Sequence, residues 1–408
     1  MNYAVPSLRI SHVGDSRGLK PVQTPPVPWN VVVPTHRREH AVEGMVMGCA
    51  VAESLTLCRN GIHPRVALKL YGRPPLQFQF QPGVGVTSHR THGLIMTIQS
   101  MLLSRTDRAR FSSQLRKRIA WYQRSFPVRH LRAHASRWMA QKFGTKQLNS
   151  LDIGFGDDPL IRSLAISVML QGCTDNATRW FESSVAVTHK DSRVLHVSLL
   201  MGYATQIAQI TESDIFNSQV ILDALILSTE EPELKCMLEK LVKPLSEKKS
   251  VSSVATLFGY EDGIPRNVFA IAVMGIYSWL RHPKNFRRAV ESVAVVGGSC
   301  CNAAAITGGL SGISLGAHQI PSEWRNSLTL FPFGKAWKEQ LIERVKDWPH
   351  GVEDIQKAES LPSRFLGQIL RNTAYSFFHL IHKVIRFPIG VIQFSFRKPP
   401  GPDGKKHP

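Results

Sequence analysis

Apolar residues recur at helical spacing from about His36 to about residue 345, and only short Gly, Pro, Asn or Asp breaks interrupt them. Side chains three and four residues apart share one face of a helix, so this periodicity predicts a succession of amphipathic helices. Few segments alternate with a period of two, and no βαβ unit with a Gly-rich phosphate loop is evident. The sequence therefore predicts one large all-α domain over residues 36–345.

The segments on either side of this domain differ from it in composition. Residues 1–35 contain the proline-rich stretch Pro21–Pro28 without helical periodicity, which predicts a mobile leader. Residues 346–408 form a basic extension that ends in K-P-P-G-P-D-G-K-K-H-P, a disordered end by composition. Within it, Phe377–Phe396 carries Lys383 and Arg386 among large apolar side chains. This stretch either packs onto the domain as additional core or lies on a membrane surface as an amphipathic element.

Neither a membrane-spanning helix nor a secretory signal is evident. A span needs about 18 or more apolar residues with few charges, and the N-terminus lacks the basic-then-apolar pattern of a signal peptide. Six cysteines spread over 408 residues form no disulfide framework and no CxxC motif. These features predict a protein of the reducing cytoplasm.

Positive charge is the unusual bulk property. Fifty Lys and Arg against 30 Asp and Glu give a net charge of +20, which favours contact with polyanions. The segment from Arg105 to Lys146 has 12 Lys or Arg and one acid, Asp107. It is either a nucleic-acid groove with stacking aromatic residues or an amphipathic helical pair with those residues in the core. Helical spacing favours the pair; the aromatic residues are Phe111, Trp121, Tyr122, Phe126 and Trp138.

Small side chains dominate the stretch V-V-G-G-S-C-C-N-A-A-A-I-T-G-G-L-S-G, Val295–Gly312. Small residues allow two backbones, or a backbone and a ligand, to approach closely. Gly44 and Gly48 lie four residues apart in a helix predicted over residues 41–55 and also admit a close helix. The adjacent thiols of Cys300 and Cys301 are metal ligands, a redox pair or neutral filler.

Six motifs resemble the ADP-ribosylglycohydrolases, the family of the dinitrogenase-reductase-activating enzyme and some crystallins. Gly44–Leu55 is similar to their opening helix, G-x-x-x-G-x-x-x-G-D-A-L. Ser88–Thr91 falls where the family has Thr-Asp-Asp-Thr, and Gly154–Arg162 is similar to G-N-G-x-x-M-R. The likeness covers Ala41–Trp324 and implies the family's compact multi-helix, all-α bundle.

The remaining three motifs follow in the family's order. Thr188–Arg193 resembles T-H-x-D-x-R, Gly297–Ile306 resembles G-G-D-x-D-T-x-A-A-I, and Ile320–Trp324 resembles I-P-x-x-W. The resemblance predicts that Ser88–Thr91, Thr188–Asp191 and Gly298–Asn302 converge on one cleft.

The departures from the family pattern concern its metal ligands. Family members cleave a glycosidic bond to ADP-ribose with two Mg²⁺ or Mn²⁺ ions, held mostly by the two Asp pairs. Here His89 and Arg90 replace the first pair, Ser299 and Cys301 replace the second, and Asn302 replaces the threonine. Hard cations prefer carboxylate oxygens, and arginine stays protonated. The resemblance therefore implies no metal cofactor here, and a pseudoenzyme that keeps the fold for binding or scaffolding.

Other positions of the family site are retained. The resemblance implies a degenerate cleft lined by Glu53, Ser88, His89, Arg90, His189 and Asp191. It also implies ligand contacts from Gly154, Gly156 and Arg162, whose guanidinium suits a diphosphate or a structural ion pair. His189 either lines the cleft or is a capped turn residue, and Glu53 is expected on a helix surface.

Several alternatives stay open. An active hydrolase with altered or metal-free chemistry needs a carboxylate pair, drawn from Glu53, Asp157, Asp158 and Asp191. A soft-metal site of His89, His189, Cys301 and Glu53 is disfavoured by the neighbouring Arg90, and a disulfide between adjacent cysteines is strained. The expected partners are ADP-ribose or an ADP-ribosylated protein, with weak contact to a polyanion or to anionic lipid through the C-terminal segment. The oligomeric state stays open.

Overall fold

The computed structural model describes residues 35–126, 158–170, 177–211, 216–346, 348 and 365–395. Outside them lie residues 1–34 of the predicted leader, Trp138, Gly154, Gly156 and Asp157, and residues 347, 349–364 and 396–408 of the extension. Thr35, the last residue of the predicted leader, is the first residue of α1. The long N-terminal helices are α1 (Thr35–Thr56), α3 (His89–Ser104) and α4 (Arg108–Arg124), with the short α2 (Pro64–Tyr71) between them. The middle of the chain forms α6 (Asp158–Met169), α7 (Ala177–Val185), α8 (Ser192–Ile210), α9 (Ser218–Leu227), α10 (Pro232–Glu239), α11 (Val242–Ser246) and α12 (Val251–Leu257). The last third forms α13 (Val268–Arg281), α14 (Phe286–Ala294), α15 (Cys300–Leu315), α16 (Ser322–Ser327), α17 (Lys335–Lys346) and α18 (Phe365–Ser395).

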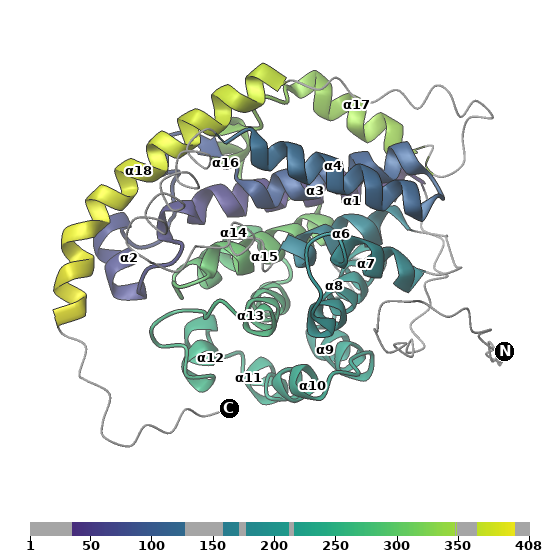
Figure 1. The fold of residues 1–408 in the computed structure, drawn as a ribbon. Helices are drawn as coiled ribbons and strands as arrows, with labels where there is room; N and C mark the ends of the chain where they lie inside the picture. Colours follow the sequence, from purple (N-terminus) through teal and green to yellow (C-terminus); the bar gives the residue numbers. More distant parts are fainter. Residues whose placement is uncertain are drawn as a thin grey trace, which may run out of the picture.

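The described elements are almost all helices, which confirms the predicted all-α class. Two short 3₁₀ helices, Leu57–Arg59 and Ala317–Gln319, extend the ends of α1 and α15. In the described ranges the sheet consists of two parallel two-residue strands, β1 (Gly85–Val86) and β2 (Leu328–Thr329). Figure 1 shows α1, α3 and α4 above α13, α14 and α15, with α9 to α12 below and α17 and α18 along the upper rim.

Helices α1 and α15 are packed backbone to backbone through glycines. A Cβ built on Gly48 would overlap the carbonyl oxygen of Gly308, and one on Gly44 would overlap that of Gly312. The two small-residue stretches singled out in the sequence therefore face each other, although about 260 residues of chain separate them. This contact brings the end of α1 against the start of α15.

One helix in the described part of the chain, Arg38–Arg59, is long and apolar enough to cross a membrane. The apolar window of that helix is 94% buried inside the protein, as expected of a core helix. It is the central helix α1, covered by α3, α15 and α17.

The basic helix α4 shows the amphipathic arrangement that helical spacing favours. Phe111, Leu115 and Tyr122 are buried, whereas Arg116 and Lys117 are exposed. The expectation that Trp121 lies in the core is wrong, because its side chain is on the solvent side of α4 and is 38% exposed. The C-terminal part of the segment that was compared with a nucleic-acid groove lies beyond residue 126, outside the described residues.

Candidate functional site

The centre of the candidate site is the carboxylate of Glu53, near the end of α1. Its side chain is fully buried, so the expectation that Glu53 lies on a helix surface is wrong. The carboxylate accepts the backbone N–H groups of Ser88 at 3.0 Å and Thr91 at 3.2 Å. It also accepts both hydroxyls, that of Thr91 at 2.6 Å. The first N–H groups of a helix have no partner within the helix, and Glu53 supplies one for the start of α3.

Arg90, in the first turn of α3, brings its positive charge to this buried carboxylate. The Nη1 atom lies 3.4 Å from a Glu53 oxygen and 3.1 Å from the Ser88 hydroxyl. The Nε–H group donates to the Asn302 side-chain oxygen at the start of α15. Burial alone would raise the pKa of the Glu53 carboxyl, but Arg90 and the hydrogen bonds from Ser88 outweigh it and hold that pKa below its ordinary value. Glu53 and Arg90 are therefore a charged, internally bonded pair.

The loop before α15 fixes Ser299 and the two cysteines by backbone contacts. Gly297 and Gly298 both have positive φ, of 76° and 61°, which glycine adopts without strain. The Ser299 N–H donates to Ile264 at 2.7 Å, and the Gly298 N–H donates to Ile62 at 2.9 Å. Ser299 is buried at the start of α15, next to the residues that contact Arg90.

Cys300 and Cys301 are reduced and buried. Burial raises the pKa of the Cys300 thiol above its ordinary value, so it stays protonated and neutral. Among the described residues, no three His, Cys, Asp or Glu side chains gather as metal ligands, so the soft-metal alternative finds no support. Both side chains are small and buried at the start of α15, and the Cys301 thiol lies 3.6 Å from the Glu53 carbonyl oxygen.

His89, the first residue of α3, contacts α6. Its Nε2 atom lies 3.5 Å from the buried Asp158 carboxylate. Burial and the Arg90 cation lower the pKa of His89 to about 3, so its ring is neutral at physiological pH. Asp158, one of the carboxylates considered for acid–base chemistry, is thus engaged by the residue next to Arg90.

Arg162 on α6 connects this region to the Thr188–Asp191 turn. Its guanidinium is buried and donates to the Ser184 carbonyl at 3.0 Å and to the Thr188 hydroxyl at 2.7 Å. That hydroxyl in turn lies 2.8 Å from Nδ1 of His189, whose pKa is lowered to about 4 by burial and by Arg162. Arg162 therefore already donates hydrogen bonds to two groups of the protein. Such contacts are typical of an arginine with a structural role rather than of one that binds a diphosphate.

Asp191 has a capping role. Its carboxylate accepts the Arg193 N–H at 3.0 Å at the start of α8 and pairs with the Arg193 guanidinium at 2.8 Å. Its side chain is 43% exposed. Of the three segments expected to converge, Ser88–Thr91 and the start of α15 are in direct contact, and the Thr188–Asp191 turn is joined to them through α6.

The structure adds α18, which the sequence interpretation left outside the site. Arg371 of α18 donates to the Thr87 carbonyl and to the Tyr122 hydroxyl, beside the start of α3. Tyr375 packs with Phe378 against Cys301, and burial raises the pKa of Tyr375 to about 12. The signal in the sequence was the recurrence of polar residues at helical spacing within an apolar segment: Gln368, Arg371, Asn372, Tyr375 and His382. The helix thus covers the site from one side.

The residues present do not fit the two metal ions of the family. Among the described residues, the carboxylate next to Arg90 is that of Glu53, which already accepts hydrogen bonds from Ser88 and Thr91 and pairs with Arg90. Serine, cysteine and asparagine at positions 299, 301 and 302 supply no second carboxylate. A guanidinium cannot deprotonate, and its charge repels another cation.

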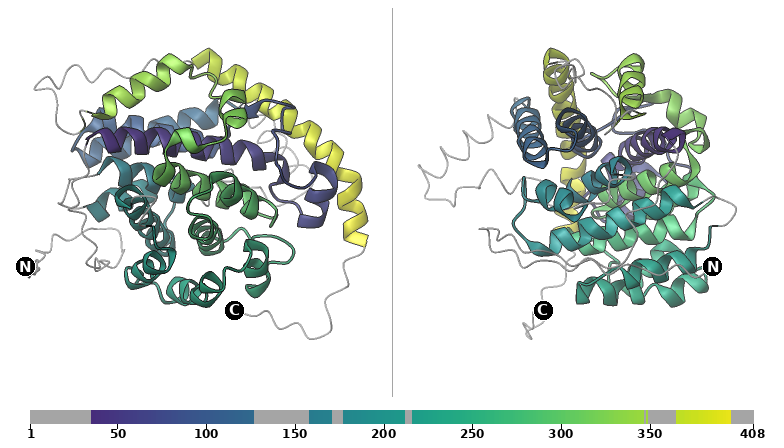
Figure 2. Two further views of the ribbon diagram at one scale, coloured as in Figure 1. Left: turned by 180° about the vertical axis from the view of Figure 1, so that it is seen from behind. Right: turned by 90° about the vertical axis from the view of Figure 1, so that its right-hand side faces the viewer.

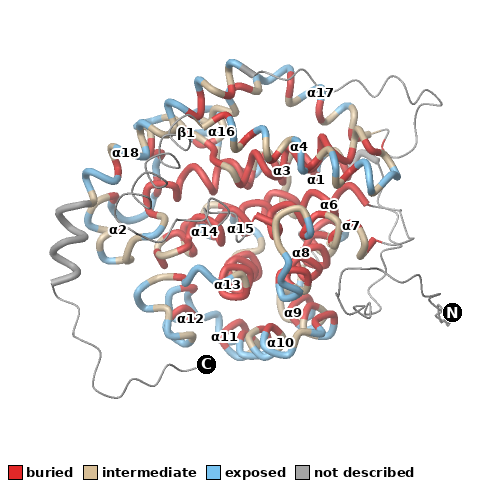
Figure 3. Tube along the Cα trace, in the orientation of Figure 1, coloured by how far each residue is buried: buried red, intermediate tan, exposed pale blue. Residues whose placement is uncertain are grey.

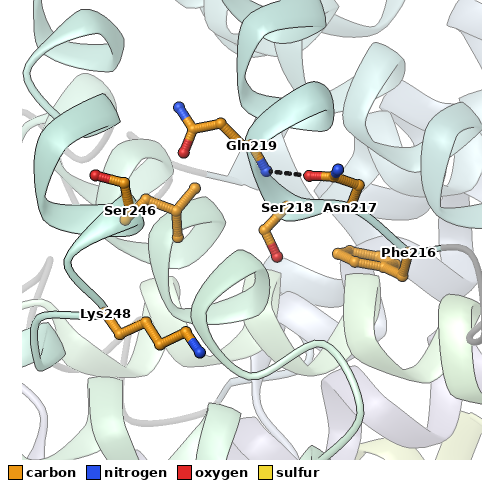
Figure 4. A pocket seen from close by; sticks show the side chains of 7 residues that line it. Phe216, Asn217, Ser218, Gln219, Ser246 and Lys248 are labelled. Atoms are coloured by element: carbon orange, nitrogen blue, oxygen red, sulfur yellow. Dashed lines mark hydrogen bonds between the residues drawn. The ribbon is translucent and has the colours of Figure 1, made fainter.

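A surface pocket lies elsewhere, between α9 and α11. Its volume is about 540 Å³, and the side chains around it are drawn in Figure 4. Asn217 caps α9 there by accepting the Gln219 N–H at 3.1 Å. The described residues that line it are Phe216, Asn217, Ser218, Gln219, Leu245, Ser246 and Lys248. Of these, Lys248 alone is ionisable, so the described lining contains no acid–base pair, and none of it belongs to the family motifs.

Buried neutral histidines make the stability of this region depend on pH. His92 of α3 is 2% exposed, and burial holds its pKa well below the ordinary value of 6.5. The unfolded chain binds a proton on this residue below about pH 6.5 and the folded chain does not, so stability is lost as the pH falls. Between about pH 6.5 and 5, His92→Gln is expected to reduce the slope of unfolding free energy against pH by up to about 1.4 kcal/mol per unit.

Urea unfolding monitored by circular dichroism across this range measures that slope. His40→Gln is the matched control, because His40 is exposed on α1. Equal slopes for the wild type and both variants would contradict the assignment to His92.

The chain is similar to one described protein family and to solved structures. A family model described as "ADP-ribosylglycohydrolase" matches residues 34–354. No curated protein sequence matches significantly. Among solved structures, one described as an "ADP-ribosylglycohydrolase-related protein complex" is 17% identical with a TM-score of 0.48, over 76% of this chain and 96% of the other. Because the family model spans most of the chain, the protein belongs to the ADP-ribosylglycohydrolase family.

Proposed function

We propose that this chain is a catalytically degenerate member of its family, which keeps the fold for binding or scaffolding. The observation that carries the proposal is the internal cation. Arg90 pairs with the buried Glu53 and is bonded to Asn302, among the positions where the family resemblance puts metal ligands. A fixed guanidinium balances charge there, but it neither activates water nor offers an exchangeable coordination site.

The surroundings of the other carboxylates support the same proposal. A metal-free hydrolase would need one carboxylic acid and one carboxylate base facing a common substrate bond. Asp191 caps α8 and pairs with Arg193, and Asp158 is buried beside His89. Glu53 is held ionised, with its lone pairs engaged by α3. None of the three is placed as a general acid with a free partner.

The partner we propose is ADP-ribose or an ADP-ribosylated protein, the ligand class of the family. The retained Thr188–His189 turn, joined to Arg162, is the part of the site where such a ligand would keep polar contacts. Tyr375 and Phe378 of α18 pack against Cys301 beside Glu53. We infer that they leave less room for a substrate bond next to the Glu53 carboxylate, which favours binding without turnover.

Mg²⁺ or Mn²⁺ at millimolar concentration is expected to leave the melting temperature unchanged. A metal at ten times its dissociation constant stabilises a protein by about 1.4 kcal/mol, a shift that thermal unfolding detects readily. In the same buffer, ADP-ribose release from a modified arginine or serine is expected to stay at background. The matched control is the Arg90→Lys variant, which keeps the positive charge.

Two results would overturn the proposal: a Mg²⁺-dependent rise in melting temperature, or Mg²⁺-dependent release of ADP-ribose by the wild type. A rise in melting temperature with ADP-ribose alone would support the binding role and identify the ligand class. No response to ADP-ribose would contradict that choice of partner, while the loss of the metal site would stand.

A further inference from the structure

Several polar side chains of helix α18 are directed inward. Arg371 and Asn372 are buried, and Asn372 donates to the Ser125 hydroxyl at 2.6 Å. His382 lies 3.0 Å from both the Tyr71 hydroxyl and the Phe80 carbonyl, and Arg386 donates to the Cys58 carbonyl. The segment therefore packs onto the domain through these polar contacts and through Tyr375 and Phe378, which extend the core around Phe80 and Cys301.

The outward face of α18 is apolar. Six of its large apolar residues are exposed, by between 48% and 73% of their surface: Leu366, Leu370, Phe377, Leu380, Val384 and Ile385. Figure 2 shows α18 along the outer rim of the molecule, and Figure 3 shows the alternation of buried and exposed residues along it. These six are half of the exposed large apolar residues in the described part of the chain. Contiguous apolar surface of this kind marks an interaction site.

Helices α2 and α4, which α18 contacts through hydrogen bonds, carry Lys and Arg but no Asp or Glu, as does α18 itself. Helix α17, next to α18 along the rim, carries charges of both signs. The sequences of α2, α4 and α18 together contain eleven Lys or Arg (two, six and three) and no Asp or Glu. Exposed cations include Lys69 on α2, Arg116 and Lys117 on α4, and Lys383 on α18 itself. Helix α4 contacts α18 through Tyr122 and Ser125, and α2 contacts it through Tyr71.

We propose that the outer face of α18 binds the surface of an anionic lipid membrane. Its apolar side chains insert at the boundary between headgroups and acyl chains, and the cations of α2 and α4 contact the acidic headgroups. The net charge of +20 draws the protein to such a surface over longer distances. This proposal does not depend on whether the family's metal-binding site has been lost.

The positive charge of α2 and α4 argues against binding of a second copy of the chain to the outer face of α18. A two-fold contact through α18 would place α2 and α4 of one copy near the same helices of the other, so that like charges would meet. An anionic lipid surface satisfies both the apolar face and the surrounding cations.

Vesicle co-sedimentation of the full-length chain tests the proposal. The wild type is expected to bind phosphatidylcholine vesicles that contain phosphatidylserine, to bind pure phosphatidylcholine vesicles at least about tenfold more weakly, and to dissociate at high salt. The triple variant Leu370→Gln, Phe377→Gln, Leu380→Gln is expected to lose this binding. The matched control changes three residues of similar exposure on other helices: Val220→Gln, Leu227→Gln and Leu257→Gln. Unchanged thermal unfolding of both triple variants confirms that they are folded.

A second pair of variants tests the charges. Arg116→Gln, Lys117→Gln and Lys69→Gln together are expected to weaken binding about tenfold or more, because each cation near an anionic surface contributes. Three exposed lysines away from α18 serve as the control: Lys240→Gln, Lys243→Gln and Lys284→Gln.

Three results would overturn the proposal. The wild type binds neither kind of vesicle, it binds both kinds equally, or the α18 variant binds as well as its control. Self-association that the α18 variant abolishes, without vesicle binding by the wild type, would assign this face to a protein contact instead.

Discussion

Replacing Arg90 by methionine is expected to lower the free energy of unfolding by about 3–5 kcal/mol. The variant removes the cation next to Glu53, whose carboxylate is fully buried, and leaves the Asn302 side-chain oxygen without this donor. A buried charge that has lost its partner bears the full cost of leaving water. Urea unfolding at neutral pH, followed by circular dichroism, measures the loss.

A double-mutant cycle separates the pair from the packing of its side chains. Glu53→Gln alone leaves the Arg90 cation buried without its counter-charge and is also expected to be strongly destabilising. The combined variant is expected to cost clearly less than the two single variants together, because it leaves no unpaired charge. Arg193→Met, which breaks the exposed pair with Asp191, is the matched control and is expected to change stability by at most about 1 kcal/mol. Additive costs of Arg90→Met and Glu53→Gln would contradict a coupled buried pair.

Replacing Gly48 by alanine is expected to cost about 3 kcal/mol or more, although it adds one methyl group to a helix. The new Cβ would overlap the Gly308 carbonyl, and because that atom is backbone, α1 and α15 would have to move apart. Such a movement also displaces Glu53 relative to Asn302, since these residues lie on the same two helices. Thermal and urea unfolding measure the cost.

Gly93→Ala is the matched control for this substitution. Gly93 is also inside a helix, α3, but nothing lies within 4 Å of a Cβ built on it. Alanine is expected to be neutral there or to stabilise by up to about 1 kcal/mol, because it restricts the unfolded chain and favours helix. Equal effects at the two positions would show that α1 and α15 do not need a glycine contact.

The sequence predicts that two stretches of small residues each allow a close neighbour. It does not predict that α1 and α15 are each other's neighbour. Gly44 and Gly48, and separately the stretch at Val295–Gly312, each predict a close neighbour through their small side chains. Nothing in either stretch says that the other is that neighbour. Pairing elements about 260 residues apart depends on the packing of the whole bundle, which local periodicity does not contain.

The site shows the same division between local and long-range information. Ser88 occupies the N-cap of α3. Its hydroxyl, however, donates to Glu53 instead of capping its own helix. Glu53 itself was expected at the surface, since a carboxylate on a helix is usually solvated; its burial depends on partners 35 and 37 residues away.

The orientation of α18 shows what a periodicity argument leaves open. The pattern predicts an amphipathic element, but it does not say whether the apolar face turns toward the domain or away from it. In the structure, backbone carbonyls at Cys58, Phe80 and Thr87 accept hydrogen bonds from the polar face of α18. Satisfying buried carbonyls outweighs the burial of more leucine surface at this position.

The side chain of Arg90 gives the site a cation that is part of the polypeptide. A coordinated ion leaves when a chelator, dialysis or a competing nucleotide lowers its free concentration, whereas a guanidinium remains as long as the chain is folded. The positive charge beside Glu53 is therefore a covalent part of the chain and does not depend on the concentration of divalent ions in the surrounding medium. Chelation with EDTA should leave the conformation of this region unchanged, because the Arg90–Glu53 pair depends only on whether the chain is folded.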